Sequence, residues 1–152
     1  MGSDRGTLEM IPSQRSQLSE AYEAIASIAR AGFTHYYCGG TRNPHAIVAT
    51  FAWQGYTDIV NIRGMDRVAA ARVPHYEGMD IFAPSRIVWH YLGSVEWTVR
   101  AMLRLVPPDH PEAPTKEYPA PLWLFVPTEE LRSLAVRPAE PRLVRAGVQR
   151  CG

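Results

Sequence analysis

The clearest pattern in the chain is the alternation of apolar and polar side chains from Ala46 to Arg63, which predicts a β-hairpin. Side chains two apart in a strand share a face of the sheet. With a two-residue loop at Gln54–Gly55, one face is aromatic and aliphatic: Ile47, Ala49, Phe51, Trp53, Tyr56, Val60 and Ile62. The other face adds polar groups to small apolar residues: Thr50, Thr57, Asn61 and Arg63. This division is typical of an antiparallel sheet with one solvated side.

Two hairpin registers remain open, because glutamine is a poor residue for the positive φ of a type I′ turn. In the two-residue register, Asp58 lies opposite Phe51 on the apolar face, where a carboxylate must be paired or protonated. A three-residue loop over residues 53–55 is the alternative. It pairs Asp58 with Thr50 and makes Trp53 a loop-tip aromatic side chain.

Helical spacing of apolar residues predicts one helix from Ser16 to Arg30 and another from Val95 to Val106. Ser16 and Ser94 are suitable N-cap residues for the two helices. Between the helices we expect strands over residues 34–38 and 86–92. Residues 68–73 are compatible with either state, because their alanines favour a helix while their context favours a strand.

The C-terminal part has a different composition, with seven prolines among residues 107–127. This predicts an extended, proline-rich arm. Residues 122–126, LWLFV, are apolar on both sides and are expected to cover the protein's own core, or otherwise a partner's. Residues 128–134 suit one or two helical turns. Residues 1–13 and the basic tail 137–152 are expected to be poorly ordered, which leaves 14–136 as a single domain.

The order of these elements predicts the fold class. The expected order is a helix, a meander of four to five antiparallel strands, a second helix and then the proline-rich arm. Consecutive strands followed by a helix are typical of an α+β domain, here with both helices packed on one face of the sheet.

Composition narrows the function classes only slightly. The chain has 152 residues and a net charge of +1, so electrostatics do not favour nucleic acid or an anionic membrane. No apolar run is long enough to span a bilayer and no signal-peptide pattern is present, so we expect a cytoplasmic protein. Only Lys116 is lysine among 16 basic residues, which is typical of a GC-rich, bacterial genome.

Candidate catalytic residues are few, and no strong sequence motif supports them. His35, Cys38 and His45 have ligand chemistry, but residues three apart on a strand face opposite ways, so neither a metal nor another cofactor is predicted. His35 and Cys38 could instead form a base–thiol pair. Asp58 and His90 are further acid–base candidates.

The candidate binding residues are aromatic side chains and arginines of the sheet and the arm: Trp53, Arg63, Arg67, Trp123 and Phe125. Because no acid–base or metal cluster converges, the leading hypothesis is a binding or regulatory protein rather than an enzyme. It would act through its sheet face, its arm or a homodimer interface. A protein partner or self-association is therefore expected, and a small-molecule ligand stays open.

Two other function classes remain as alternatives. The first is a small enzyme with a pocket between the sheet and the helices. The second is a nucleic-acid-binding accessory protein that uses arginines of the sheet face and the tail, including Arg63, Arg67 and Arg72. Nucleic acid is not favoured over a protein partner, because acidic residues such as Asp58 and Asp66 dilute the positive charge.

Overall fold

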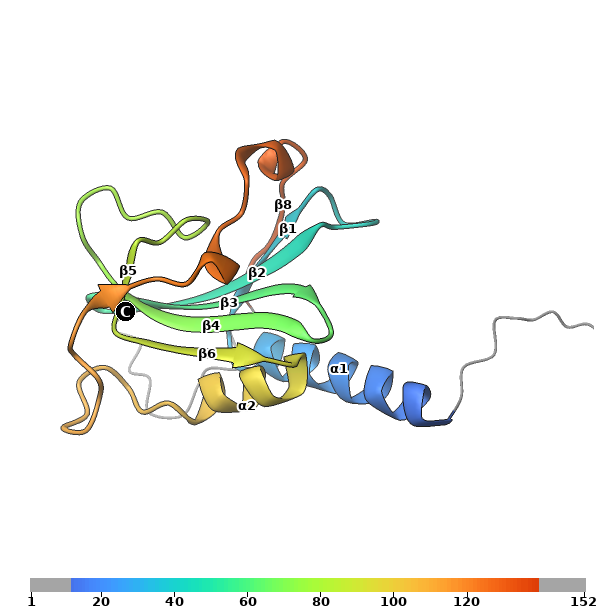
Figure 1. Ribbon diagram of the computed structural model, residues 1–152, viewed down its shortest axis with the longest axis horizontal. Coiled ribbons are helices and arrows are strands. Elements are labelled where there is room, and N and C mark those ends of the chain that lie inside the picture. Colours follow the sequence, from blue (N-terminus) through green and yellow to red (C-terminus); the bar gives the residue numbers. More distant parts are fainter. Residues whose placement is uncertain (1–11, 140–152) are drawn as a thin grey trace, which may run out of the picture.

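The computed structural model describes residues 12–139 and shows an α+β fold with a six-stranded antiparallel sheet (Figure 1). Two helices lie against one face of this sheet, and a second, two-stranded sheet lies beside it. The helices are α1 (Pro12–Arg30) and α2 (Val95–Arg104), with 3₁₀ turns η1 (Leu122–Leu124) and η2 (Thr128–Leu131). The strands are β1 (Thr34–Cys38), β2 (Ala46–Trp53), β3 (Tyr56–Gly64), β4 (Arg67–Pro74), β5 (Arg86–Ile87), β6 (Trp89–Gly93), β7 (Tyr118–Pro119) and β8 (Ala135–Arg137).

The order of strands in the large sheet is β6-β4-β3-β2-β1-β8. Strands β1 to β4 form a meander, as the sequence predicts. The strand expected over residues 86–92 is divided in two at Val88, because β5 pairs with β7 in the small sheet and β6 pairs with β4 in the large one. Arg137, expected to begin a disordered tail, instead ends β8, which pairs with β1. Residues 140–152 of the predicted tail, and residues 1–11, lie outside the described residues.

The hairpin between β2 and β3 adopts the two-residue register. Trp53 pairs with Tyr56 and Phe51 pairs with Asp58. Gly55 takes the positive φ of the turn, at 83°. Asp58 is consequently fixed on the apolar face, and Trp53 is not at the tip of a loop. The ambiguous segment 68–73 belongs to β4.

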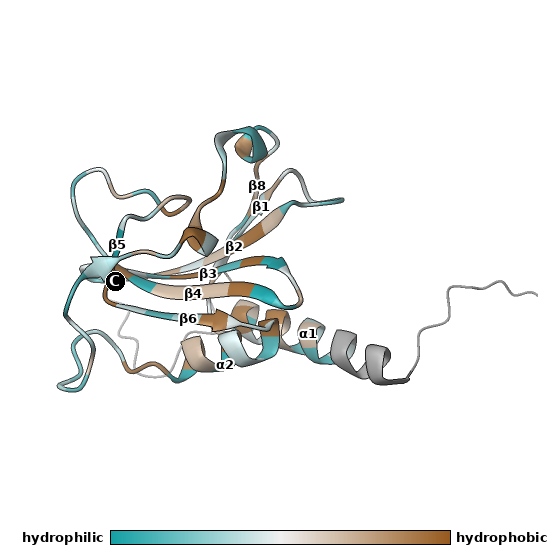
Figure 2. Cartoon of the chain, in the orientation of Figure 1, coloured by the Kyte–Doolittle hydropathy of each residue, from teal (hydrophilic) through white to brown (hydrophobic). Residues whose placement is uncertain are grey.

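Both faces of the sheet are buried, which corrects the expectation of one solvated side. The face toward the helices packs against side chains that include Ile28, Val99 and Met102. The opposite face packs against Leu124, Val126 and residues of the 76–82 loop. In Figures 1 and 2, η1 lies on the side of the sheet away from the helices and is partly hydrophobic in colour. Asn61, expected to be solvated, is only 1% exposed.

The sequence signals for α2 are confirmed at its start. Ser94 has an extended backbone conformation, and its side chain accepts a hydrogen bond from the Trp97 N–H (3.4 Å). Glu96 lies in the first turn and Arg104 in the last, where each suits the helix dipole. The helix ends at Arg104, two residues before the predicted end. Helix α1 begins at Pro12, so Ser16 lies inside it rather than at its N-cap; proline is well suited to a first helical turn.

Replacing Ser94 by alanine is expected to lower the free energy of unfolding by about 1 kcal/mol, because one N–H of the first turn loses its acceptor. Urea denaturation followed by circular dichroism measures the difference. Ser133→Ala, in an exposed turn, is the matched control. Equal effects of the two substitutions would show that the Ser94 cap contributes nothing.

Candidate functional site

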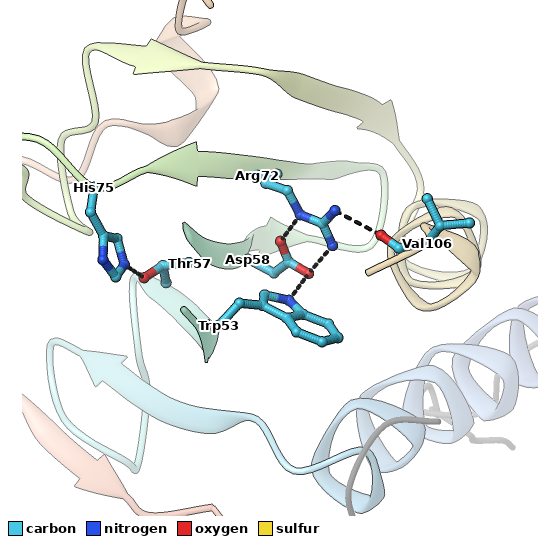
Figure 3. Close-up of polar contacts among 6 residues, drawn as sticks. All are labelled: Trp53, Thr57, Asp58, Arg72, His75 and Val106. Atoms are coloured by element: carbon cyan, nitrogen blue, oxygen red, sulfur yellow. Dashed lines mark hydrogen bonds and ion pairs between the residues drawn. The ribbon is translucent and has the colours of Figure 1, made fainter. Parts of the chain in front are cut away.

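A buried ion pair between Asp58 of β3 and Arg72 of β4 lies on the helix-facing side of the sheet (Figure 3). The guanidinium binds the carboxylate with two hydrogen bonds, Nε to Oδ1 at 2.7 Å and Nη2 to Oδ2 at 2.9 Å. Both side chains are 0% exposed. Trp53 donates its indole N–H to Oδ2 (2.8 Å), and Arg72 Nη1 donates to the Val106 carbonyl (2.7 Å). A carboxylate held in this way is a structural anchor, since its oxygens already accept hydrogen bonds from the protein.

The candidate pair of His35 and Cys38 is divided between the two faces of the sheet. Cys38 is buried in the core on the face away from the helices, where burial raises the pKa of its thiol. His35 pairs with Ala49, whose side chain belongs to the core on the helix side. The two side chains therefore cannot act as a base–thiol pair. The described part of the chain has no group of three or more His, Cys, Asp or Glu residues that could hold a metal ion.

His90 lies on the exposed edge strand β6 and makes a local contact. Its Nδ1 is 2.6 Å from the Tyr118 hydroxyl, so it links β6 to β7. The two rings are edge-on, with centroids 5.5 Å apart. This arrangement ties the segment before η1 to the sheet.

Four of the five predicted binding residues meet each other, on the face of the sheet away from the helices. Arg63 donates to the Phe125 carbonyl (3.0 Å) and forms an ion pair with Glu130 (3.2 Å). The Arg67 guanidinium lies 5.8 Å from the centre of the Trp123 ring. These arginines hold the C-terminal segment on the sheet. The fifth residue, Trp53, belongs to the Asp58–Arg72 cluster on the other face.

Sequence reasoning missed a cleft between α1, β1 and β8, which we call the α1–β1 cleft. It has a volume of about 330 Å³. Helix α1 forms one wall and the side chains of β1 form the floor, while β8 closes the edge. The residues that line it are Tyr22, Ile25, Ala26, Ala29, Arg30, Phe33, His35, Tyr37, Arg137 and Pro138.

His35 is a buried polar residue at the floor of this cleft and is 4% exposed. Burial lowers the pKa of His35, a hydrogen bond to the Phe33 backbone raises it, and the positive charge of Arg137 lowers it again, with a net decrease. The imidazole is consequently neutral at pH 7. Nε2 is buried and has no hydrogen-bond partner. A hydrogen bond that raises the pKa of an imidazole is one that its N–H donates, so we assign the Phe33 bond to Nδ1 and the lone pair to Nε2.

Apart from Arg30 and Arg137, the other residues that line the cleft are aromatic or aliphatic, and none of the lining residues is acidic. The Tyr37 ring lies 6.4 Å from the His35 ring, centre to centre, and Tyr22 on α1 is 66% exposed. Tyr22 and Ile25 also line a neighbouring apolar pocket of about 210 Å³, toward Ile47 and Ile62. The period-two rule already places Phe33, His35 and Tyr37 on one face. The contribution of β8 has no sequence signal.

Comparison with models of protein families, with curated proteins and with solved structures found no match to this chain. Within residues 12–139, no helix is both long and apolar enough to cross a membrane. The candidate site therefore stands on its geometry alone.

Proposed function

We propose that this chain binds a small, flat and largely apolar molecule in the α1–β1 cleft. The observation that carries the proposal is the unpartnered Nε2 of His35 in the floor of an aromatic cleft. Leaving a buried acceptor without a donor costs about 1–3 kcal/mol, and native proteins seldom retain such a group. A ligand hydroxyl or N–H that reaches Nε2 removes this cost.

The size and lining of the cleft agree with the proposal. Its volume of about 330 Å³ is at the lower end of the range of small-molecule sites. Phe33, Tyr37 and Tyr22 offer ring faces and edges for a planar ligand. Such sites combine apolar walls with a small number of polar groups that fix the orientation of the ligand.

A larger hollow of about 580 Å³ lies between α1 and α2, but its chemistry is different. It is lined by charged side chains, among which Glu96 and Arg100 form an ion pair across one turn of α2 (2.9 Å). Charged, solvated walls of this kind do not need a ligand to satisfy them. The α1–β1 cleft is therefore the better site despite its smaller volume.

The test uses 2-naphthol, a flat probe with one hydroxyl donor, titrated into the protein at pH 7 and followed by NMR. We expect the resonances of Phe33, His35, Tyr37 and Tyr22 to shift together with one affinity. His35→Phe keeps a planar ring and removes the acceptor, so it should weaken binding about fivefold, the equivalent of about 1 kcal/mol for one hydrogen bond. His90→Phe, on the exposed edge strand, is the control and should leave the affinity unchanged.

The same variant also distinguishes a binding residue from a structural one. His35→Phe removes both the unsatisfied Nε2 and the hydrogen bond to the Phe33 backbone, so its free energy of unfolding should stay within about 1 kcal/mol of the wild type. If a saturating concentration of 2-naphthol shifts none of the cleft resonances, the proposal is wrong. It is also wrong if His35→Phe binds 2-naphthol as tightly as His90→Phe does.

A further inference from the structure

We propose that the ligand of the α1–β1 cleft is an aromatic carboxylate that carries a hydroxyl or N–H donor, and that Arg137 and Arg30 bind its carboxylate. This inference rests on the proposed function and adds the charge of the ligand to it. The observation that carries it is the placement of two guanidinium groups in a cleft whose lining contains no acid.

The register of β1 and β8 places Arg137 next to His35. The two residues are direct partners across the antiparallel pair, so their side chains lie on the same face of the sheet. Directly opposed residues in such a pair have Cβ atoms about 5 Å apart. Consistent with this, the charge of Arg137 contributes to the lowered pKa of His35. The guanidinium is thus within reach of any molecule that contacts Nε2.

Arg30, in the last turn of α1, borders both this cleft and the hollow between α1 and α2. Its Nη2 contacts the Ser27 hydroxyl (3.3 Å), which is neutral. Among the described residues, Arg30 and Arg137 have no carboxylate partner. Arg63, Arg72, Arg86 and Arg100 each have one. Within residues 12–139, no carboxylate competes with an anion for Arg137, so we assign it the main contact with the ligand and Arg30 a smaller one.

These positions define a ligand with two different ends. An aromatic ring suits the walls formed by Phe33, Tyr37 and Tyr22. A donor at one end meets the neutral His35, and a carboxylate meets the guanidinium groups, which bind planar carboxylates with paired hydrogen bonds. A cationic ligand is disfavoured, because no acidic side chain lines the cleft to offset the two positive charges.

The experiment compares 6-hydroxy-2-naphthoate with its neutral carboxamide, 6-hydroxy-2-naphthamide, by NMR titration at pH 7 and low salt. The two probes share the ring and the hydroxyl, and the amide replaces the carboxylate by a neutral group of nearly the same shape. We expect wild type to bind the carboxylate about tenfold more tightly, the effect of one charge-assisted contact at a partly exposed site. Raising the salt concentration should weaken binding of the carboxylate and leave binding of the amide unchanged.

Arginine variants locate the effect. R137Q should lose most of the preference for the carboxylate while its affinity for the amide stays the same, and R30Q should lose part of that preference. R132Q changes an exposed arginine outside the cleft and should behave as wild type.

The outcomes separate this inference from the proposed function. If both probes bind wild type equally well and shift the cleft resonances, the ligand is not an anion, and the cleft remains a binding site. If the preference for the carboxylate survives in both R137Q and R30Q, the assignment of these arginines is wrong. If neither probe shifts the cleft resonances, the proposed function and this inference both fail.

Discussion

Replacing Asp58 by alanine is expected to lower the free energy of unfolding by about 3–5 kcal/mol, because it leaves Arg72 charged and buried without its partner. Arg72 is 0% exposed, so water cannot replace the lost carboxylate without opening the structure. The indole N–H of Trp53 loses its acceptor as well. Urea denaturation at 25 °C, followed by tryptophan fluorescence and circular dichroism, measures the change.

A matched control is Glu117→Ala, which removes one partner of the exposed pair with Arg86. Exposed pairs contribute about 0–1 kcal/mol, so this substitution should have little effect. If Asp58→Ala does not fold, the double variant Asp58→Leu/Arg72→Met provides the second measurement. Replacing both charges by apolar groups should recover much of the stability, since a buried pair can be exchanged for apolar contacts at little cost. Equal effects of Asp58→Ala and Glu117→Ala would contradict the structural role.

The Asp58–Arg72 pair also explains how the helix layer is positioned. Arg72 binds the carbonyl of Val106, directly after α2, and so fixes where the chain leaves that helix. Helix α1 packs beside α2 and forms a wall of the α1–β1 cleft (Figure 1). The ion pair thus affects the cleft only through the positions of α2 and α1, and contributes no residue to it.

Local patterns were sufficient to predict the central elements of this fold. Period-two alternation and Gly55 predict the β2–β3 hairpin, and Ser94 and Pro107 bracket α2. The anomaly of Asp58 on an apolar face is also visible in the sequence. The sequence does not show that Arg72 is the partner of Asp58, because the segment around Arg72 is compatible with either a helix or a strand. Only the pairing of β3 with β4 brings the two residues together.

The mistaken expectations concern contacts between residues far apart in the chain. Thr50, Thr57 and Asn61 are polar, and that suggested a solvated face. They are buried, and the 76–82 loop and the segment after β7 pack on the same face of the sheet, which no alternation within β2 or β3 can indicate. In the same way, the sequence indicates His35 as a candidate base, but with Cys38 as its partner. Its neighbour in the cleft is Arg137, 102 positions away in the sequence, brought there by β8.

Replacing Leu124 by alanine is expected to lower the free energy of unfolding by about 2–5 kcal/mol, the usual effect of truncating a buried leucine. Leu124 is 0% exposed and lies in the core on the face of the sheet away from the helices. Leu122→Ala is a close control, because it removes the same atoms two residues earlier in the same 3₁₀ turn, at a side chain that is 86% exposed. It should change stability by less than about 0.5 kcal/mol. Urea denaturation of the two variants measures the difference.

The comparison decides whether the C-terminal segment is an integral layer of the domain. The segment is fastened by Arg63 to the Phe125 carbonyl, by Arg67 over Trp123, and by the Val126 N–H to the Phe82 carbonyl (2.7 Å). A large effect of Leu124→Ala means that this layer unfolds together with the sheet. The sheet face and its arginines are then unavailable to nucleic acid or to a partner in the native state. Equal effects of Leu124→Ala and Leu122→Ala would instead show that the segment adds no stability to the sheet, and that this face can be uncovered at little cost.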